Sequence, residues 1–194
     1  MLVDSRRAFA RCVNHALASQ GLASRPDAEL HPFLGPPLHA TFARLAGAAL
    51  ADACVQAYRE RYRVEATAET SVVEGVPEAL DLLDDELVVV TSKPQALAEP
   101  LLEALGLRSR FAAVFGPALS ERAEPKTATL SRAFSAHAPR ALVGDRSFDI
   151  VAAHAHDIRA VGVLWGIGSE NELRTARADS IAATPAALVP LLAA

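Results

Sequence analysis

Apolar residues in the first third of the chain recur at the spacing of amphipathic helices. Asp4 and Ser5 suit the start of a first helix, because their side-chain oxygens can accept hydrogen bonds from free backbone N–H groups. The pattern continues to about Val64 without strand-like alternation, and the prolines and glycine of residues 32–37 interrupt it with a rigid connection. The positions that carry the pattern are Phe9, Cys12, Val13, Ala16, Leu17, Leu38, Phe42, Leu45, Leu50, Cys54, Ala57 and Tyr58. We therefore expect only helices in this part.

From Gly75 onward, short apolar runs alternate with helical patterns. Pro77 and Pro94 stand where helices can begin, since the first turn of a helix does not need the proline N–H. The runs that we expect to be strands cover residues 87–90, 113–115, 141–143 and 161–164. Such alternation is typical of a parallel sheet covered by helices on both faces. The sequence therefore predicts an α/β fold with an additional helical region.

The composition is that of one globular domain that carries an insertion. The 194 residues are 51% hydrophobic and 22% charged, with a formal net charge of -4. This balance predicts no basic surface for nucleic acid, and no apolar run approaches the ~20 residues of a membrane helix. Cys12 and Cys54 fall within helical patterns and are expected to be reduced core residues. Because the N-terminus also lacks the pattern of an export signal, we predict a cytoplasmic protein.

Polar residues follow two of the expected strands and begin one of the expected helices. Thr91 and Ser92 follow the first strand, Lys126 starts a helix, and Asp145 and Asp149 follow the third strand. Each residue alone is typical of a cap or a solvated surface, but the carboxyl ends of parallel strands meet at one edge of a sheet. Two carboxylates at this edge suit Mg²⁺, and the hydroxyl and ammonium groups would complete a site for a phosphate group.

The order of hydroxyl, lysine and GDxxxD resembles motifs two, three and four of the haloacid dehalogenase (HAD) superfamily of hydrolases. Segments along nearly the whole chain also resemble its phosphoglycolate phosphatase branch: FLGPPL, YRERY, EGVPEAL, VVVTSKP, VGDRSFDI and VGVLWGIGSENEL. The resemblance implies a HAD-like Rossmannoid core with a parallel sheet at residues 71–194, and a small helical cap with its connecting helix at residues 1–70. It also implies a Mg²⁺-dependent hydrolase that acts on a small phosphorylated metabolite.

The same resemblance implies a role for each candidate residue. Thr91, Ser92 and Lys126 would bind the phosphate, and Thr91 and Lys126 would stabilise the charge on the transferring phosphoryl group. Asp145 would hold Mg²⁺, with Asp149 as a second ligand or at the edge of the metal site. A phosphomutase of the same superfamily stays open as an alternative, because it would share this core.

The chain begins within the region where the family carries its first motif. Relatives start with a strand and a DxDGT or DxDGV loop that runs into LVDS, which is residues 2–5 here. Met1 then stands at the loop's Thr or Val, so both aspartates of the motif, the nucleophile and the general acid and base, would precede it. We expect a start codon placed too late, since a GTG codon for Val initiates as Met. A truncation and a non-catalytic binder of a phosphorylated ligand are the alternatives, and each leaves the sheet without its first, central strand.

Overall fold

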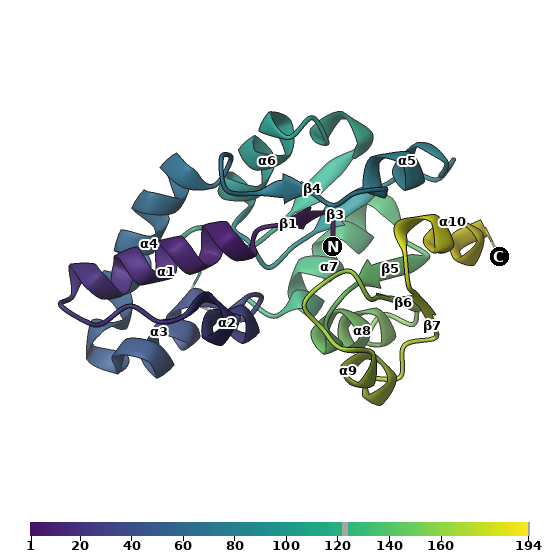
Figure 1. The fold of residues 1–194 in the computed structure, drawn as a ribbon. Helices are drawn as coiled ribbons and strands as arrows, with labels where there is room; N and C mark the ends of the chain where they lie inside the picture. Colours follow the sequence, from purple (N-terminus) through teal and green to yellow (C-terminus); the bar gives the residue numbers. More distant parts are fainter. Residues whose placement is uncertain (122–123, 194) are drawn as a thin grey trace.

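The computed structural model describes residues 1–121 and 124–193, which form a region of helices beside a region of strands and helices (Figure 1). The helical region consists of α1 (Arg6–Ser19), α2 (Asp27–Leu30), η1 (His31–Phe33), α3 (Leu38–Ala46), η2 (Ala48–Leu50) and α4 (Ala51–Glu65). Its helices enclose one apolar cluster, in which Phe9 and Phe42 contact the Tyr58 ring at centroid distances of 5.9 and 6.1 Å. The helical pattern predicted for this part of the sequence is confirmed.

The segment before α1 crosses to the other region. Val3 and Asp4 form β1, which pairs antiparallel with β2 (Ser71–Val72). Two-residue strands leave too short a pattern for the sequence to indicate, and neither was expected. Ser5 occupies the N-cap position of α1 without a side-chain cap, whereas the Asp4 Oδ1 atom accepts the backbone N–H of Arg6 at 3.0 Å. The helix therefore starts where predicted, with Asp4 rather than Ser5 satisfying a free donor.

Two parallel sheets make up the strand region. In one, β3 (Val88–Val90) pairs with β4 (Ala113–Phe115), and in the other β5 (Ala141–Gly144), β6 (Arg159–Val163) and β7 (Ser180–Ala182) pair in that order. The helices that connect and follow the strands are α5 (Val76–Asp81), α6 (Gln95–Ala104), η3 (Arg108–Arg110), α7 (Lys126–His137), α8 (Ser147–His154), α9 (Glu170–Thr175) and α10 (Pro185–Ala193). The predicted α/β class and the four predicted strands are confirmed, and β7 is an additional strand.

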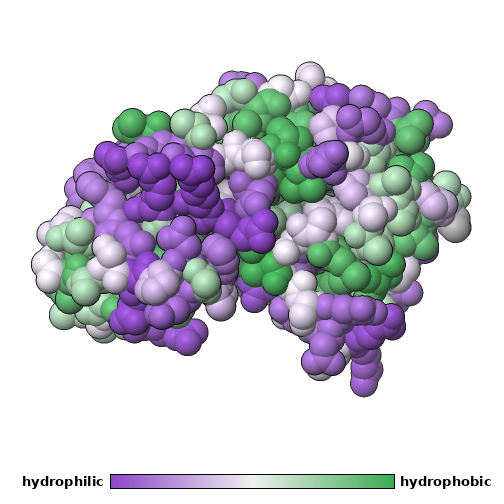
Figure 2. All heavy atoms as spheres, in the orientation of Figure 1, coloured by the Kyte–Doolittle hydropathy of each residue, from purple (hydrophilic) through white to green (hydrophobic). Residues whose placement is uncertain are grey.

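Helices cover both faces of these sheets because successive side chains of a strand point to opposite sides. Val90 packs with Leu130 of α7, whereas its neighbour Val89 belongs to the cluster formed by α6. In the second sheet, Ala160 belongs to the cluster with α8, and Val161 packs with α10. On the surface shown in Figure 2, apolar residues gather on the strand region, while the helical region is mainly hydrophilic.

The two sheets do not pair with each other. Between β3 and β5, the described part of the chain contributes no strand, and residues of both line one cavity of about 1610 Å³. Helices α7 and α8 close one side, since Leu130, Ala133 and Ala152 pack against side chains of both sheets. The cavity extends from this gap to α4 of the helical region. The gap between β3 and β5 thus separates two parallel sheets that share the helices α7 and α8.

The expectations for the two cysteines and for membrane-spanning helices can be compared with the structure directly. Cys12 and Cys54 are both buried free thiols, as expected for reduced core residues. Within residues 1–121 and 124–193, no helix has the length and apolar character needed to cross a membrane.

Candidate active site at the carboxyl ends of the strands

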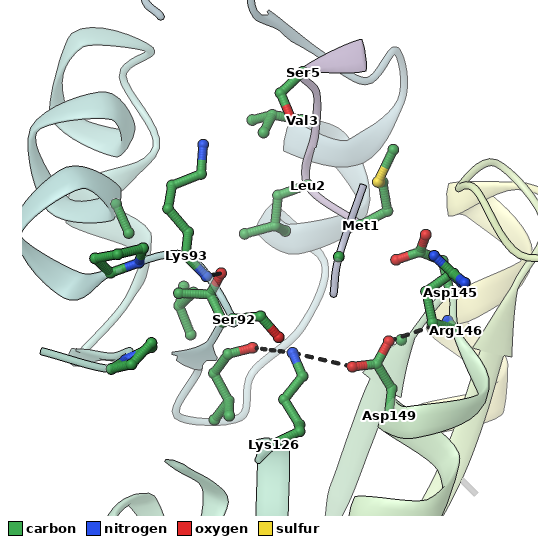
Figure 3. A pocket seen from close by; sticks show the side chains of 18 of the residues that line it. Met1, Leu2, Val3, Ser5, Ser92, Lys93, Lys126, Asp145, Arg146 and Asp149 are labelled. Carbon is green, nitrogen blue, oxygen red and sulfur yellow. Dashed lines mark hydrogen bonds and ion pairs between the residues drawn. The ribbon is translucent and has the colours of Figure 1, made fainter. Parts of the chain in front are cut away.

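Lys126 links the ends of the two sheets. It is the first residue of α7, and its Nζ atom donates to the carbonyl oxygen of Val90, the last residue of β3, at 2.9 Å. The same Nζ lies 3.0 Å from Oδ1 of Asp149, which is on α8 beyond β5 (Figure 3). Only 11% of the Lys126 side chain is exposed. Because an ammonium group has three N–H donors, these two contacts leave one donor for a ligand.

Asp149 is the buried partner of this lysine. Its Oδ2 atom accepts the backbone N–H of Arg146 at 3.1 Å, which satisfies the first turn of α8. Gly144 lies directly beneath it, since a Cβ atom at position 144 would stand 2.2 Å from Cβ of Asp149. The glycine of the GDxxxD motif therefore allows the Asp149 carboxylate to approach the end of the strand.

Asp145 is held by the loop that follows β6. Its Oδ2 atom accepts the backbone N–H of Ile167 at 2.8 Å. A Cβ atom at Gly166 would stand 2.2 Å from Cβ of Asp145, so this loop can approach only because residue 166 is glycine. The hydrogen bond fixes one carboxylate oxygen and turns the side chain towards the cavity, which Asp145 also lines.

The carboxylates of Asp145 and Asp149 fit a magnesium ion whose remaining ligands are water molecules and substrate phosphate. The described residues contain no group of three or more His, Cys, Asp or Glu side chains that could hold a metal ion. Mg²⁺, however, is commonly bound through one or two carboxylates, with waters and substrate phosphate completing its octahedral shell. Asp145 would be the better placed of the two to hold the ion, because both oxygens of Asp149 already bind Lys126 and Arg146.

Thr91 and Ser92 form the loop directly after β3. The Thr91 backbone N–H donates to the Phe115 carbonyl oxygen at 2.9 Å, which extends the pairing with β4 by one residue. Its Oγ1 atom accepts the backbone N–H of Lys93 at 3.1 Å, so the hydroxyl hydrogen can still be donated to a ligand. Ser92 lies on the side of the loop that faces Lys126 (Figure 3).

The main chain of Met1 lies between the loop that holds Ser92 and the side chain of Asp145 (Figure 3). Its carbonyl oxygen accepts the indole N–H of Trp165 at 3.0 Å, and its amino group is buried near Asp145, Asp149 and Lys126. Burial lowers the pKa of this amino group, and the two carboxylates oppose that shift. Residues 1–3 therefore occupy the entrance to the gap between β3 and β5 (Figure 3).

A family model for haloacid dehalogenase-like hydrolases matches residues 1–163. The chain belongs to this family. The matched range includes Thr91, Lys126, Asp145 and Asp149, whose assignment to motifs two, three and four stays a prediction from the sequence resemblance.

Named relatives and solved structures resemble this HAD-like hydrolase along most of its length. It is 33% identical to a 5'-nucleotidase of Pseudomonas aeruginosa over 98% of this chain and 90% of that protein. A phosphoglycolate phosphatase of Agrobacterium fabrum is 32% identical over 85% of this chain and 77% of its own length. The crystal structure of a predicted phosphatase from Clostridium acetobutylicum superposes with a TM-score of 0.91 and 26% identity, covering 99% of this chain and 93% of that one.

All five predicted site residues of the hydrolase line the same cavity: Thr91, Ser92, Lys126, Asp145 and Asp149. Lys126 and Asp149 are in direct contact, whereas the roles of the five residues towards a ligand stay predictions.

Arg146, which the sequence places between the two aspartates, connects the two regions of the molecule. Its guanidinium group donates to the Leu34 carbonyl oxygen at 2.8 Å and pairs with Glu172 at 3.0 Å. It therefore ties the proline-rich loop of the helical region to the strand region.

Basic residues that the sequence did not indicate also line the cavity. Lys93 and Arg59 both line the cavity, the first directly after Ser92 and the second on α4. The lysine of TSKP stands next to a predicted site residue, which is the one signal in the sequence that could have indicated it. Nothing in the pattern of α4 indicates that Arg59 lines this cavity.

Proposed function

We propose that this HAD-like hydrolase is a Mg²⁺-dependent phosphatase of small phosphomonoesters, similar to phosphoglycolate phosphatases. The observation that carries this proposal is the placement of the Lys126–Asp149 pair beside Asp145, at the carboxyl ends of β3 and β5. A buried ammonium group with a free donor, together with a carboxylate suited to Mg²⁺, matches the needs of phosphoryl transfer. The phosphatase names of the relatives support the same reaction class.

Each of the five predicted site residues has a defined role in this proposal. Lys126 donates to a phosphoryl oxygen and stabilises the charge that builds up there, and the Thr91 and Ser92 hydroxyl groups donate to the other oxygens. Asp149 holds Lys126 in place, and its contact with the Arg146 N–H fixes its own position. Mg²⁺, when bound through Asp145, would neutralise charge on the phosphoryl group. These residues position a phosphate but do not attack it.

We further propose that the nucleophilic aspartate lies on a strand that precedes residue 1 and fills the gap between β3 and β5. Three features support this: the two sheets are unpaired along the gap, the cavity continues between them, and Met1 enters it beside Lys126 and Asp145. A strand there would pair with backbone groups of both neighbours. It would also place its last residues opposite the Lys126 ammonium group.

The test is a protein extended by the strand and DxDG loop encoded in frame upstream of Met1. We expect the extended protein to melt at a higher temperature and to release phosphate from phosphomonoesters. Changing only the first aspartate of that loop to Asn should retain the higher melting temperature and abolish hydrolysis, since the strand and the nucleophile contribute separately.

The outcome also separates the alternatives. A phosphomutase would interconvert phosphorylated sugars faster than it releases phosphate. If no such strand is encoded upstream, or if the extended protein melts no higher and hydrolyses nothing, the proposal fails, and a non-catalytic binder of phosphorylated ligands replaces it.

A further inference from the structure

The wall of the cavity opposite the strand ends is formed by α4. Arg59, Tyr62 and Arg63 of this helix line the cavity, and their spacing places them on one face of the helix. Tyr62 is 3% exposed and stacks on Tyr58, so this face is held against the core of the helical region. The two arginines line the same cavity as Lys126 and Asp145.

Lys93 reaches this wall from the strand side. Its side chain extends away from Lys126 and Asp149 (Figure 3), and its Nζ atom contacts the hydroxyl group of Tyr62 and lies 4.4 Å from the centre of the Tyr62 ring. Burial lowers the pKa of Lys93 to about 8, which a paired lysine would not show. The loop that presents Ser92 to the phosphate site thus also presents a second ammonium group to the helical wall.

These three cations have no carboxylate partner within ion-pair distance among the described residues. Within the described part of the chain, Lys93, Arg59 and Arg63 form no ion pair, and the Arg59 Nε atom is buried without a hydrogen-bond partner. Of the carboxylates of α4, Asp52 lies 3.4 Å from His39, Glu60 accepts a hydrogen bond from Gln56, and Glu65 pairs with Arg61. A buried donor without a partner destabilises the protein unless a ligand satisfies it.

We infer that Lys93, Arg59 and Arg63 form a second anion subsite, which binds a negatively charged group on the alcohol part of the phosphomonoester. The inference rests on the proposed function, in which Lys126 and Asp145 bind the phosphate. The substrate class is then a phosphomonoester with a carboxylate or a second phosphate at its other end. A nucleoside monophosphate, whose alcohol part is uncharged, would leave the three cations unpaired.

The test uses pairs of ligands that differ in one charge, titrated calorimetrically into the full chain. Phosphoglycolate is compared with ethyl phosphate, phosphogluconate with glucose phosphate, and a sugar bisphosphate with the sugar monophosphate. We expect the doubly anionic member of at least one pair to bind about tenfold tighter or better. The pair with the largest difference then identifies the second group as a carboxylate or a phosphate, and the distance at which it is bound.

Variants assign this preference to residues. Lys93→Met and Arg59→Met should each reduce the preference towards one without weakening the binding of the singly anionic ligand. The matched control is Arg174→Met, which removes an exposed arginine that is paired with Glu170 on α9 and does not line the cavity. It should change neither affinity.

The two possible failures can be told apart. If the singly anionic ligands bind and Lys126→Met abolishes that binding, but no pair shows a preference or the preference survives in Lys93→Met and Arg59→Met, the second subsite is refuted and the phosphate site stands. If no ligand binds, or if Lys126→Met leaves the binding of ethyl phosphate unchanged, the proposed function fails, and the subsite fails with it.

Discussion

The two walls of the cavity each contain a lysine, and the two lysines have opposite electrostatic surroundings. On the strand side, Lys126 is 11% exposed and lies between the Val90 carbonyl oxygen and Asp149, so its charge is balanced inside the protein. On the helical side, Lys93 is partly buried against the Tyr62 ring and has no carboxylate within ion-pair distance among the described residues. Both lysines line one space.

This difference assigns the two lysines different roles: one holds a hydrogen-bond donor in a fixed position, and the other favours the binding of an anion. A balanced pair such as Lys126–Asp149 holds a donor in one place before a ligand arrives, which is the condition for stabilising a transition state. Unbalanced cations lower the stability of the free protein, and an anion that binds beside them removes this penalty. The strand side therefore suits the chemistry common to the family, and the helical side suits the choice of substrate.

The largest effect on stability should come from breaking the balanced pair. Lys126→Met leaves the Asp149 carboxylate buried without its cation, and such a loss costs about 3–5 kcal/mol of unfolding free energy. Urea denaturation at neutral pH measures it. The double variant Lys126→Met with Asp149→Leu should recover part of the loss, and a single variant as stable as the wild type would show that the pair is not balanced as described.

Removing Lys93, the lysine without a carboxylate partner among the described residues, should instead increase the stability of the protein. The pKa of Lys93 falls from 10.5 to about 8 in the folded protein, so Lys93→Met should raise the unfolding free energy by up to about 3 kcal/mol at neutral pH. The loss of the contact with the Tyr62 ring offsets part of this gain.

The pH dependence of this gain follows from the direction of the shift. Below pH 8 Lys93 is charged in both states and the full penalty applies, whereas between pH 8 and 10.5 the unfolded chain binds more protons and wild-type stability rises. The groups beside Lys93 stay neutral in this range, because burial raises the pKa of Cys12 to about 12 and that of Tyr62 as well. The difference between wild type and Lys93→Met should therefore shrink above pH 8, and a constant difference would contradict the assignment.

A smaller effect is expected at the loop that holds Asp145. Gly166→Ala places a Cβ atom where Cβ of Asp145 lies 2.2 Å away, so the loop or the aspartate must shift, at about 1–3 kcal/mol. Mg²⁺ affinity measured by calorimetry should fall with it. The control is Gly162→Ala on β6, whose Cβ atom would also be crowded, by Leu173 Cδ1 at 2.9 Å and Ile181 Cγ1 at 3.4 Å, but not by Asp145. Equal Mg²⁺ affinity in both variants would show that Asp145 does not need its present position.

The features whose position the sequence predicted are those that follow from local pattern. Apolar runs near residues 88, 113 and 141 form β3, β4 and β5, and polar residues after β3 and β5 meet because parallel strands end at one edge. Lys126 joins them because it opens the helix that packs beneath β3 and β5.

The features that the sequence left open depend on contacts between distant segments. The strand β7 is three residues with one β-branched member, and it is fixed by its pairing with β6 rather than by its own pattern. Arg59 reads as a solvated residue of an amphipathic helix, because only the position of α4 relative to the TSKP loop brings it to the cavity. The helical wall of the site could therefore not be predicted.

The central claim is that Lys126 and Asp145 serve a metal-dependent phosphoryl transfer. Its most direct test is the rate of phosphate release by the extended protein as Mg²⁺ is titrated, in the wild-type sequence and in Asp145→Asn. We expect release that requires Mg²⁺ and falls about a hundredfold or more in the variant, since a carboxylate that holds the metal beside the phosphate is lost. Release that proceeds equally in a chelator, or that Asp145→Asn leaves unchanged, would contradict this account.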